Sequence, residues 1–159
     1  MKLPSSSFGY TLIELLVTLT IVSLLFGFGY ANYRGFARNQ ALVAAARVVK
    51  ADLRLAQGQA LAGKKPVGCD VLDGYYFRWL SSASYRIEAS CLNGDYPLKT
   101  VDNVFDGTTI SVPSPNPILF KVLGKGTNVA EGSPASLSLE RVGVENPLVV
   151  TVTSAGEIK

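Results

Sequence analysis

The sequence predicts an α+β fold, in which a long N-terminal α-helix with a transmembrane half and an amphipathic half packs on a C-terminal antiparallel β-sheet domain. Three observations predict it. Residues 15–33 form a run of 19 residues without a charge. Hydrophobic residues then recur at three-to-four spacing to about residue 62, and strand and turn signals dominate after Pro66. The 159 residues are enough for one ordinary domain.

The composition excludes several classes of enzyme. The chain has no histidine, which excludes Ser-His-Asp and Cys-His catalysis and histidine-ligated zinc. Its two cysteines cannot build a four-thiolate zinc site. The Gly-Lys-Gly-Thr run at 124–127 lacks the spacing of a phosphate-binding loop. We therefore expect no catalytic residue, no metal site and no cofactor, and the protein is not expected to be an enzyme.

The hydrophobic residues are concentrated near the N-terminus. Residues 10–33 hold 16 apolar residues out of 24. As a helix, the uncharged run would be about 28 Å long, close to the hydrocarbon thickness of a bilayer. Glu14 stands directly before this run, although a carboxylate costs about 2.5–3.5 kcal/mol at the centre of a membrane helix. Such a carboxylate requires a partner.

Three interpretations fit this segment. It could be a secretory signal peptide, with Lys2 in the basic region and Gly29 and Ala31 at the cleavage site, or a plain membrane anchor. The third starts from the string Phe-Gly-Tyr-Thr-Leu-Ile-Glu-Leu-Leu-Val at residues 8–17. This string closely resembles the signature of type IV prepilins. The match comprises a short basic leader ending in Gly9, an aromatic residue, and Thr-Leu-x-Glu before the apolar run.

The prepilin resemblance implies a specific maturation and assembly. In that family a membrane peptidase cuts after the glycine, here between Gly9 and Tyr10, and N-methylates the exposed Tyr10. Glu14 then pairs with the N-terminal amine of a neighbouring subunit in a filament. A carboxylate and an ammonium that satisfy each other in hydrocarbon favour the correct axial stagger between subunits. The implied partners are other pilins or pseudopilins, the prepilin peptidase, the inner-membrane assembly platform and, before assembly, membrane lipid.

The same resemblance implies the organisation of the chain and its place in the cell. Residues 1–9 are the removed leader, 10–33 the transmembrane and filament-core helix, 34–62 the amphipathic helix and 63–159 the exported β domain. We expect a single-pass protein of the bacterial inner membrane with a periplasmic C-terminal domain, which later enters a pilus or pseudopilus. Four basic residues between 34 and 50 favour the opposite orientation by the positive-inside rule. We give precedence to the resemblance.

The amphipathic helix is predicted to end near residue 62. The Gly-Lys-Lys-Pro run at 63–66 combines a C-terminal glycine, cations for the helix dipole and a proline. The predicted apolar stripe of this helix consists of Ala37, Ala41, Ala45, Val48, Asp52 or Leu53, Ala56 and Ala60.

Strands are predicted at residues 75–80, 84–89, 109–112, 118–123, 136–141 and 148–153. In the first of them, alternation places Tyr75, Phe77 and Trp79 on the core face. Prolines at 113, 115 and 117 predict a connection between strands. Turns are predicted at Asp73-Gly74, Asn93-Gly94, Asp106-Gly107 and Ala155-Gly156.

The two cysteines allow two states. Cys69 and Cys91 flank the first predicted hairpin. A disulfide between them would contribute about 3 kcal/mol by chain entropy and would suit a small exported sheet. The alternative is two buried free thiols.

A second resemblance covers much of the chain more loosely. The closing strand and Gly-x-Ile-x ending at 148–159, with the Arg-Leu-Ala run at 54–56, are similar to the H-type minor pseudopilin and FimT-type minor pilin group. The function expected is therefore that of a structural subunit, a minor pilin or pseudopilin, of a type IV pilus or a type II secretion-type filament.

Two other functions stay open. Some FimT-like minor pilins are implicated in DNA uptake, and Tyr76, Arg78 and Arg86 combine an aromatic ring with guanidinium groups, as contacts to single-stranded DNA require. Residues 64–159 hold nine basic and ten acidic residues, which gives little electrostatic drive toward DNA. The other function is that of an ordinary secreted or anchored β-domain binding protein.

Overall fold

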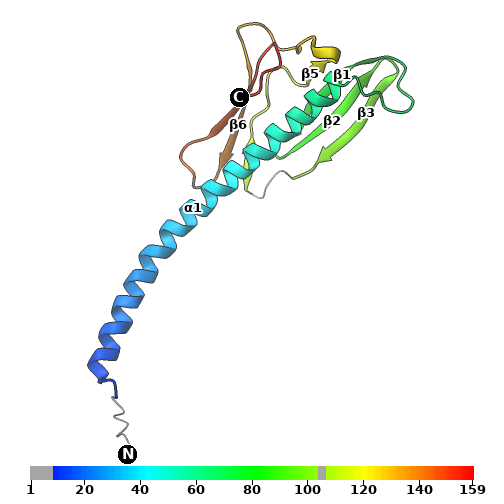
Figure 1. Ribbon diagram of the computed structural model, residues 1–159. Helices are drawn as coiled ribbons and strands as arrows, with labels where there is room; N and C mark the ends of the chain where they lie inside the picture. The colour runs from blue at the N-terminus through cyan, green and yellow to red at the C-terminus, as the bar shows by residue number, and fades with distance from the viewer. Residues whose placement is uncertain (1–8, 104–106) are drawn as a thin grey trace, which may run out of the picture. The chain divides into compact units, whose positions relative to one another are not determined.

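The computed structural model describes residues 9–103 and 107–159 (Figure 1). The leader residues 1–8 and Asp106 of the predicted Asp106-Gly107 turn lie outside the described residues. Within these described ranges, one helix, α1 (Leu12–Leu61), is followed by seven strands, which confirms the predicted α+β class. The chain divides into two compact units, one up to Ala37 and one from Arg38 to Lys159, and each is described by itself.

The first half of α1 is exposed wherever its side chains are described. Its mean hydropathy reaches 2.2 over an 18-residue window, and among the described residues α1 is the one helix long and apolar enough to cross a membrane. The polar side chains in this half bond to the helix itself. The Thr18, Thr20 and Ser23 hydroxyls donate to the carbonyl oxygens of Leu15, Val17 and Leu19 at 2.8–2.9 Å.

The second half of α1 buries one face in the core of the body. The buried apolar residues of this face are Leu42, Ala45, Ala46, Val49, Leu53, Ala56 and Ala60. The prediction was correct from Leu53 onward and at Ala45, but wrong for Ala37 and Val48, which are exposed, while Ala41 is half-buried. The buried face therefore starts later than predicted, and the larger side chains Leu42 and Val49 fill the interface in place of their neighbours Ala41 and Val48.

The helix ends as predicted at its glycine. Gly63 takes a left-handed φ of 58°. Its amide donates to the Ala60 carbonyl at 3.1 Å, and the Lys64 amide donates to the Gln59 carbonyl at 3.2 Å. These two bonds form a Schellman motif, which satisfies carbonyls that the helix end would otherwise leave unpaired.

Two antiparallel sheets complete the body. The first has the order β3-β2-β1-β5 and the second has the order β4-β6-β7. Figure 1 shows the cyan-to-green half of α1 lying against them. The first sheet consists of β1 (Leu72–Ser81), β2 (Ser84–Cys91), β3 (Gly94–Val101) and β5 (Ile118–Lys121), and the second of β4 (Thr108–Ile110), β6 (Ala135–Arg141) and β7 (Leu148–Val152).

The predicted strands all exist, but two features were missed. β3 was not predicted, because it is an edge strand whose residues are mostly exposed and include Pro97, so it lacks an alternating apolar pattern. The predicted turn at Asp73-Gly74 is wrong, because both residues lie in β1. There, a Cβ on Gly74 would lie 2.2 Å from the Phe120 carbonyl oxygen of β5. This glycine serves the close approach of two strands and not a turn.

Two of the remaining predicted strands also have shifted boundaries. The predicted 109–112 strand is observed at Thr108–Ile110. The predicted 118–123 strand stops at Lys121 and is followed by a short 3-10 turn, η1 (Val122–Gly124), in which Leu123 has a φ of 56°. The 113–117 prolines form a connection between β4 and β5, as predicted.

Aromatic rings from β1 and β2 form the centre of the core. Phe77 and Trp79 from β1 stack with Tyr85 from β2, with ring centroids 4.7 Å and 5.6 Å from that of Tyr85. The disulfide prediction is confirmed: Cys69 and Cys91 are bonded, with their Cα atoms 5.6 Å apart. The bond joins the connection after α1 to the last residue of β2, and both cysteines are buried.

Candidate assembly helix and body surfaces

The start of α1 is fixed by a side-chain cap. The Thr11 hydroxyl oxygen accepts a hydrogen bond from the Glu14 amide at 3.3 Å. Thr11 is thus the N-cap residue and Glu14 lies in the first turn, where the helix dipole favours a negative charge. Sequence reasoning missed the role of Thr11. The signal was present, since Thr-x-x-Glu before an apolar run is a capping-box pattern.

Glu14 is the one charged residue between Leu12 and Tyr33. The hydroxyl groups of this half bond to helix carbonyls, but among the described residues no ion pair or side-chain hydrogen bond of the Glu14 carboxylate is found. Its side chain is exposed on an apolar helix. In a hydrocarbon environment this carboxylate needs a cation from outside the helix.

The Gly9-Tyr10 peptide bond lies directly before this cap. Neither residue belongs to α1, and the Tyr10 side chain is 83% exposed. No heavy atom of the described residues outside the glycine's own neighbours lies within 4 Å of the Cβ position at Gly9. The Gly9-Tyr10 bond therefore lies outside the helix, next to an exposed Tyr10 side chain.

The body contains an ion pair between α1 and the first sheet in which the carboxylate is buried and the ammonium is partly exposed. Asp52 of α1 is 5% exposed. Its Oδ2 accepts a hydrogen bond from the Tyr85 hydroxyl of β2 at 2.6 Å, and its Oδ1 lies 2.7 Å from the Lys99 Nζ of β3. Burial raises the pKa of Tyr85, and so does the hydrogen bond to Asp52. Sequence reasoning placed Asp52 on the buried stripe but could not pair it, since the strand of Lys99 was not predicted.

The residues proposed for DNA contact lie on the face of the first sheet that is turned away from the core. Arg78 pairs with the buried Glu88 and, at 2.9 Å, with Asp95. Its guanidinium lies 5.3 Å from the centroid of the Tyr76 ring. Arg86 lies 3.9 Å from Glu88. The structure thus brings the three residues together. However, the carboxylates of Glu88 and Asp95 balance the charges of the two guanidinium groups. The Arg78 guanidinium also covers the Tyr76 ring, on which a base would have to stack.

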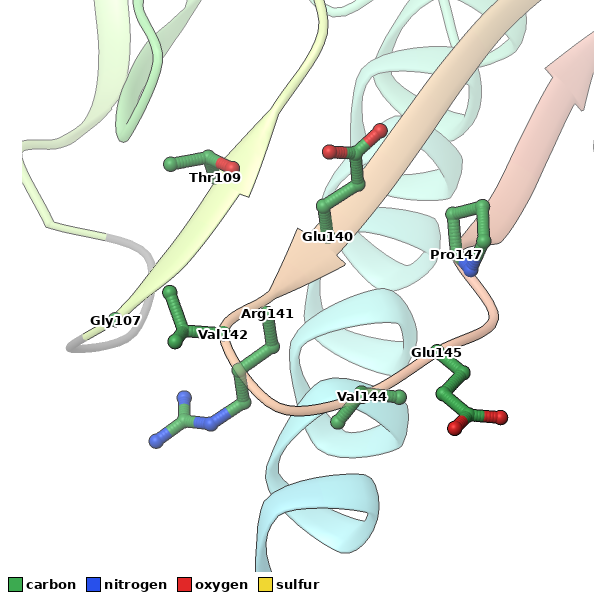
Figure 2. A pocket seen from close by; sticks show the side chains of 8 residues that line it. All are labelled: Gly107, Thr109, Glu140, Arg141, Val142, Val144, Glu145 and Pro147. Atoms are coloured by element: carbon green, nitrogen blue, oxygen red, sulfur yellow. The ribbon is translucent and has the colours of Figure 1, made fainter.

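A surface pocket of about 400 Å³ lies at the ends of β4 and β6. Figure 2 shows that the charged ends of Glu140, Arg141 and Glu145 point to different sides. The Arg141 guanidinium donates to the Thr108 hydroxyl oxygen at 3.0 Å. Polar groups do not converge on one point here, and no cluster of metal-binding side chains occurs in the described part of the chain.

These features together define a class of membrane-anchored protein. An exposed apolar helix carries a carboxylate in its first turn, a glycine-aromatic peptide bond precedes the helix, and an α+β body follows it. Residues 4–30 match the model of the prokaryotic N-terminal methylation motif. Residues 45–156, more than half of the chain, match the family model described as type II transport protein GspH, and the chain belongs to this family. The protein is thus a type IV pilin-like pseudopilin of the H type. No match was found among curated proteins or among solved structures.

Proposed function

We propose that this protein is a minor pseudopilin or minor pilin, a structural subunit of a type II secretion-type filament or a type IV pilus that assembles through its N-terminal helix. The observation that carries the proposal is the exposed apolar start of α1, in which Glu14 is the one charged residue between Leu12 and Tyr33. A helix of this kind is stable in lipid or among similar helices, but not in water. The family has a structural role, so we propose no catalytic residue, metal or cofactor.

Maturation begins in the membrane. The prepilin peptidase cuts between Gly9 and Tyr10 and methylates the new amine of Tyr10, removing residues 1–9. Residues 10–33 then anchor the protein in the inner membrane, and residues 34–62 with 63–159 form the body on the periplasmic side. The open Gly9-Tyr10 bond supports the cleavage site, and the disulfide supports an oxidising compartment for the body.

Assembly transfers the helix from lipid to the filament, with the inner-membrane assembly platform and sister pilins as partners. The Glu14 carboxylate pairs with the N-terminal amine of a neighbouring subunit. A correct stagger satisfies both charges, whereas a shift leaves both unpaired in an apolar environment. Glu14 therefore selects the register of the filament.

Intact-mass measurement of the protein extracted from membranes tests this proposal. The expected mass corresponds to loss of residues 1–9 and gain of one methyl group. A Gly9→Leu variant should keep the full mass, and Glu14→Gln should still be cleaved but should not enter filaments. Cleavage after Ala31, or a wild-type chain that keeps residues 1–9, would replace the proposal with an ordinary secreted protein or a plain anchored one.

DNA uptake remains the second candidate for the body, through Tyr76, Arg78 and Arg86. The proximity of an aromatic ring to two guanidinium groups supports it, and the paired carboxylates weigh against it. The test is retardation of single-stranded DNA by the full chain in detergent micelles at two salt concentrations. Retardation that weakens in an Arg78→Ala variant would support DNA binding, and its absence at low salt would remove this function.

A further inference from the structure

The edge strands of the two sheets are protected to different degrees. β5 is covered by the segment after it, because Lys121 and Leu119 bond to the backbone of Gly126 and Asn128. β3 contains Pro97, and a proline blunts an edge strand. β4 has only three residues, and the Ile110 amide at its end donates to the Ser82 carbonyl at 2.9 Å. Among the described residues, β7 is covered only in its last part, where the chain turns back and residues 157–159 lie beside it. An exposed edge invites pairing with another chain, so β7 is the strand to examine.

Backbone hydrogen bonds show which β7 groups point to the open edge. Thr151 exchanges two bonds with Lys159, its amide donating at 3.2 Å and its carbonyl accepting at 3.0 Å. Residues two apart in a strand point to the same side. Val149 therefore directs its amide and carbonyl to the same edge as Thr151, and among the described residues neither group has a hydrogen-bond partner on that side.

A groove of about 250 Å³ runs beside this edge. It lies between β7 and the second half of α1. Ala46 and Val43 contribute apolar surface from α1, and Val149 is 52% exposed. Arg47 and Lys50 also line the groove, and neither forms an ion pair with any described residue. The groove thus combines an apolar surface, two cations and an unpaired backbone edge.

We infer that the β7 edge and this groove bind an extended, acidic segment of a partner protein, which adds as a further strand beside Val149. A strand is favoured over a helix because only a strand supplies the alternating donors and acceptors that the Val149 backbone lacks. The side chains on the face of the added strand that is turned toward α1 enter the groove, where apolar ones contact Val43 and Ala46 and carboxylates meet Arg47 and Lys50. The charge of these two residues selects an acidic partner over a basic one. The inference does not depend on cleavage of the leader or on filament assembly.

Peptide titration of the full chain in detergent micelles tests this inference. The probe is a fluorescent peptide with blocked ends and the repeat valine-threonine-glutamate-threonine, which places valine and glutamate on the same face of a strand. Binding is followed by fluorescence anisotropy against empty micelles. Two matched peptides serve as controls, one with alternate amides N-methylated and one with lysine in place of glutamate. The acidic peptide should bind saturably, and each control at least about tenfold more weakly, since one loses backbone bonds and the other meets like charges.

Variants of the edge and the groove separate the two contributions. Val149→Pro removes the outward amide, which no β6 bond uses, and should weaken binding about threefold to tenfold. Val149→Thr keeps the amide and should bind like the wild type. The double variant Arg47→Glu with Lys50→Glu should reverse the preference toward the lysine peptide.

Three results would overturn the inference: no saturable binding of the acidic peptide, equal binding of the N-methylated peptide, or an unchanged preference in the charge-reversed variant. Equal binding of the N-methylated peptide would assign the groove to a helix or another apolar ligand. The fluorescence of the buried Trp79 reports whether each variant is folded. If Val149→Pro does not fold, the affinity of the wild-type chain for the N-methylated peptide shows whether backbone hydrogen bonds contribute to binding.

Discussion

Replacing Asp52 by alanine tests how much the contacts of this buried carboxylate contribute to holding α1 against the first sheet. The substitution leaves the fully buried Tyr85 hydroxyl without its acceptor at 2.6 Å, and an unsatisfied buried group costs about 1–3 kcal/mol. The Lys99 side chain is 43% exposed and regains water, so losing its contact adds little. We expect Asp52→Ala to lower the free energy of unfolding by about 2–3 kcal/mol.

A double-mutant cycle isolates the interaction. Tyr85→Phe keeps the ring stacked on Phe77 and Trp79 and removes only the hydroxyl, which should cost about 1 kcal/mol. In the double variant no hydroxyl is left unpaired, so the combined loss should be smaller than the sum by about 1–2 kcal/mol. Urea unfolding of the full chain in detergent micelles, followed by the fluorescence of the single tryptophan, measures all four proteins. Additive losses, or a loss below about 0.5 kcal/mol for Asp52→Ala, would refute this reasoning.

The remaining predictions use the same unfolding measurement. Gly74→Ala should lower the free energy of unfolding by about 3 kcal/mol or more, because the new Cβ would lie 2.2 Å from a β5 carbonyl oxygen. Gly58→Ala, at an exposed position of α1 with open space around it, should raise the free energy of unfolding by about 0.5–1 kcal/mol. Equal effects of the two substitutions would contradict the close approach of β1 and β5. Replacing both Cys69 and Cys91 by alanine should lower the free energy of unfolding by about 3 kcal/mol. A reducing agent should then have no further effect on the stability of this variant. Because the pKa of Tyr85 is raised in the fold, only the unfolded chain ionises this group above pH ~10, so stability should fall there by up to about 1.4 kcal/mol per pH unit. Tyr85→Phe should flatten that decline, and an unchanged slope would show that other groups cause it.

The helix and the core face of β1 could be predicted because strong local patterns determine them. The uncharged run and the glycine at 63 mark the extent of α1, and alternation alone places Tyr75, Phe77 and Trp79 in the core, where they are buried. The cysteine spacing was compatible with two states, and the fold selected the disulfide by bringing both Cα atoms within bonding range.

The features that sequence reasoning missed depend on contacts between distant segments. β3 forms because β2 offers it a hydrogen-bonding edge, not because Pro97 and its exposed neighbours favour a strand. Gly74 was interpreted as a turn residue because Asp-Gly is a turn signal, and only the position of β5 shows why a side chain is not tolerated there. The partners of Asp52 and of Arg78 were hidden for the same reason, since each lies on another strand.

The hydroxyl groups of Thr18, Thr20 and Ser23 give the first half of α1 a further property. Each is bonded to a carbonyl of the preceding turn, so these side chains need neither water nor a neighbouring protein to satisfy them. In the assembly that we propose, the helix would exchange lipid tails for protein side chains without breaking those bonds. The energetic barrier to such a transfer is concentrated at a single ionisable group near one end of the helix, and the rate of transfer should respond far more to a substitution at Glu14 than to loss of any of these hydroxyls.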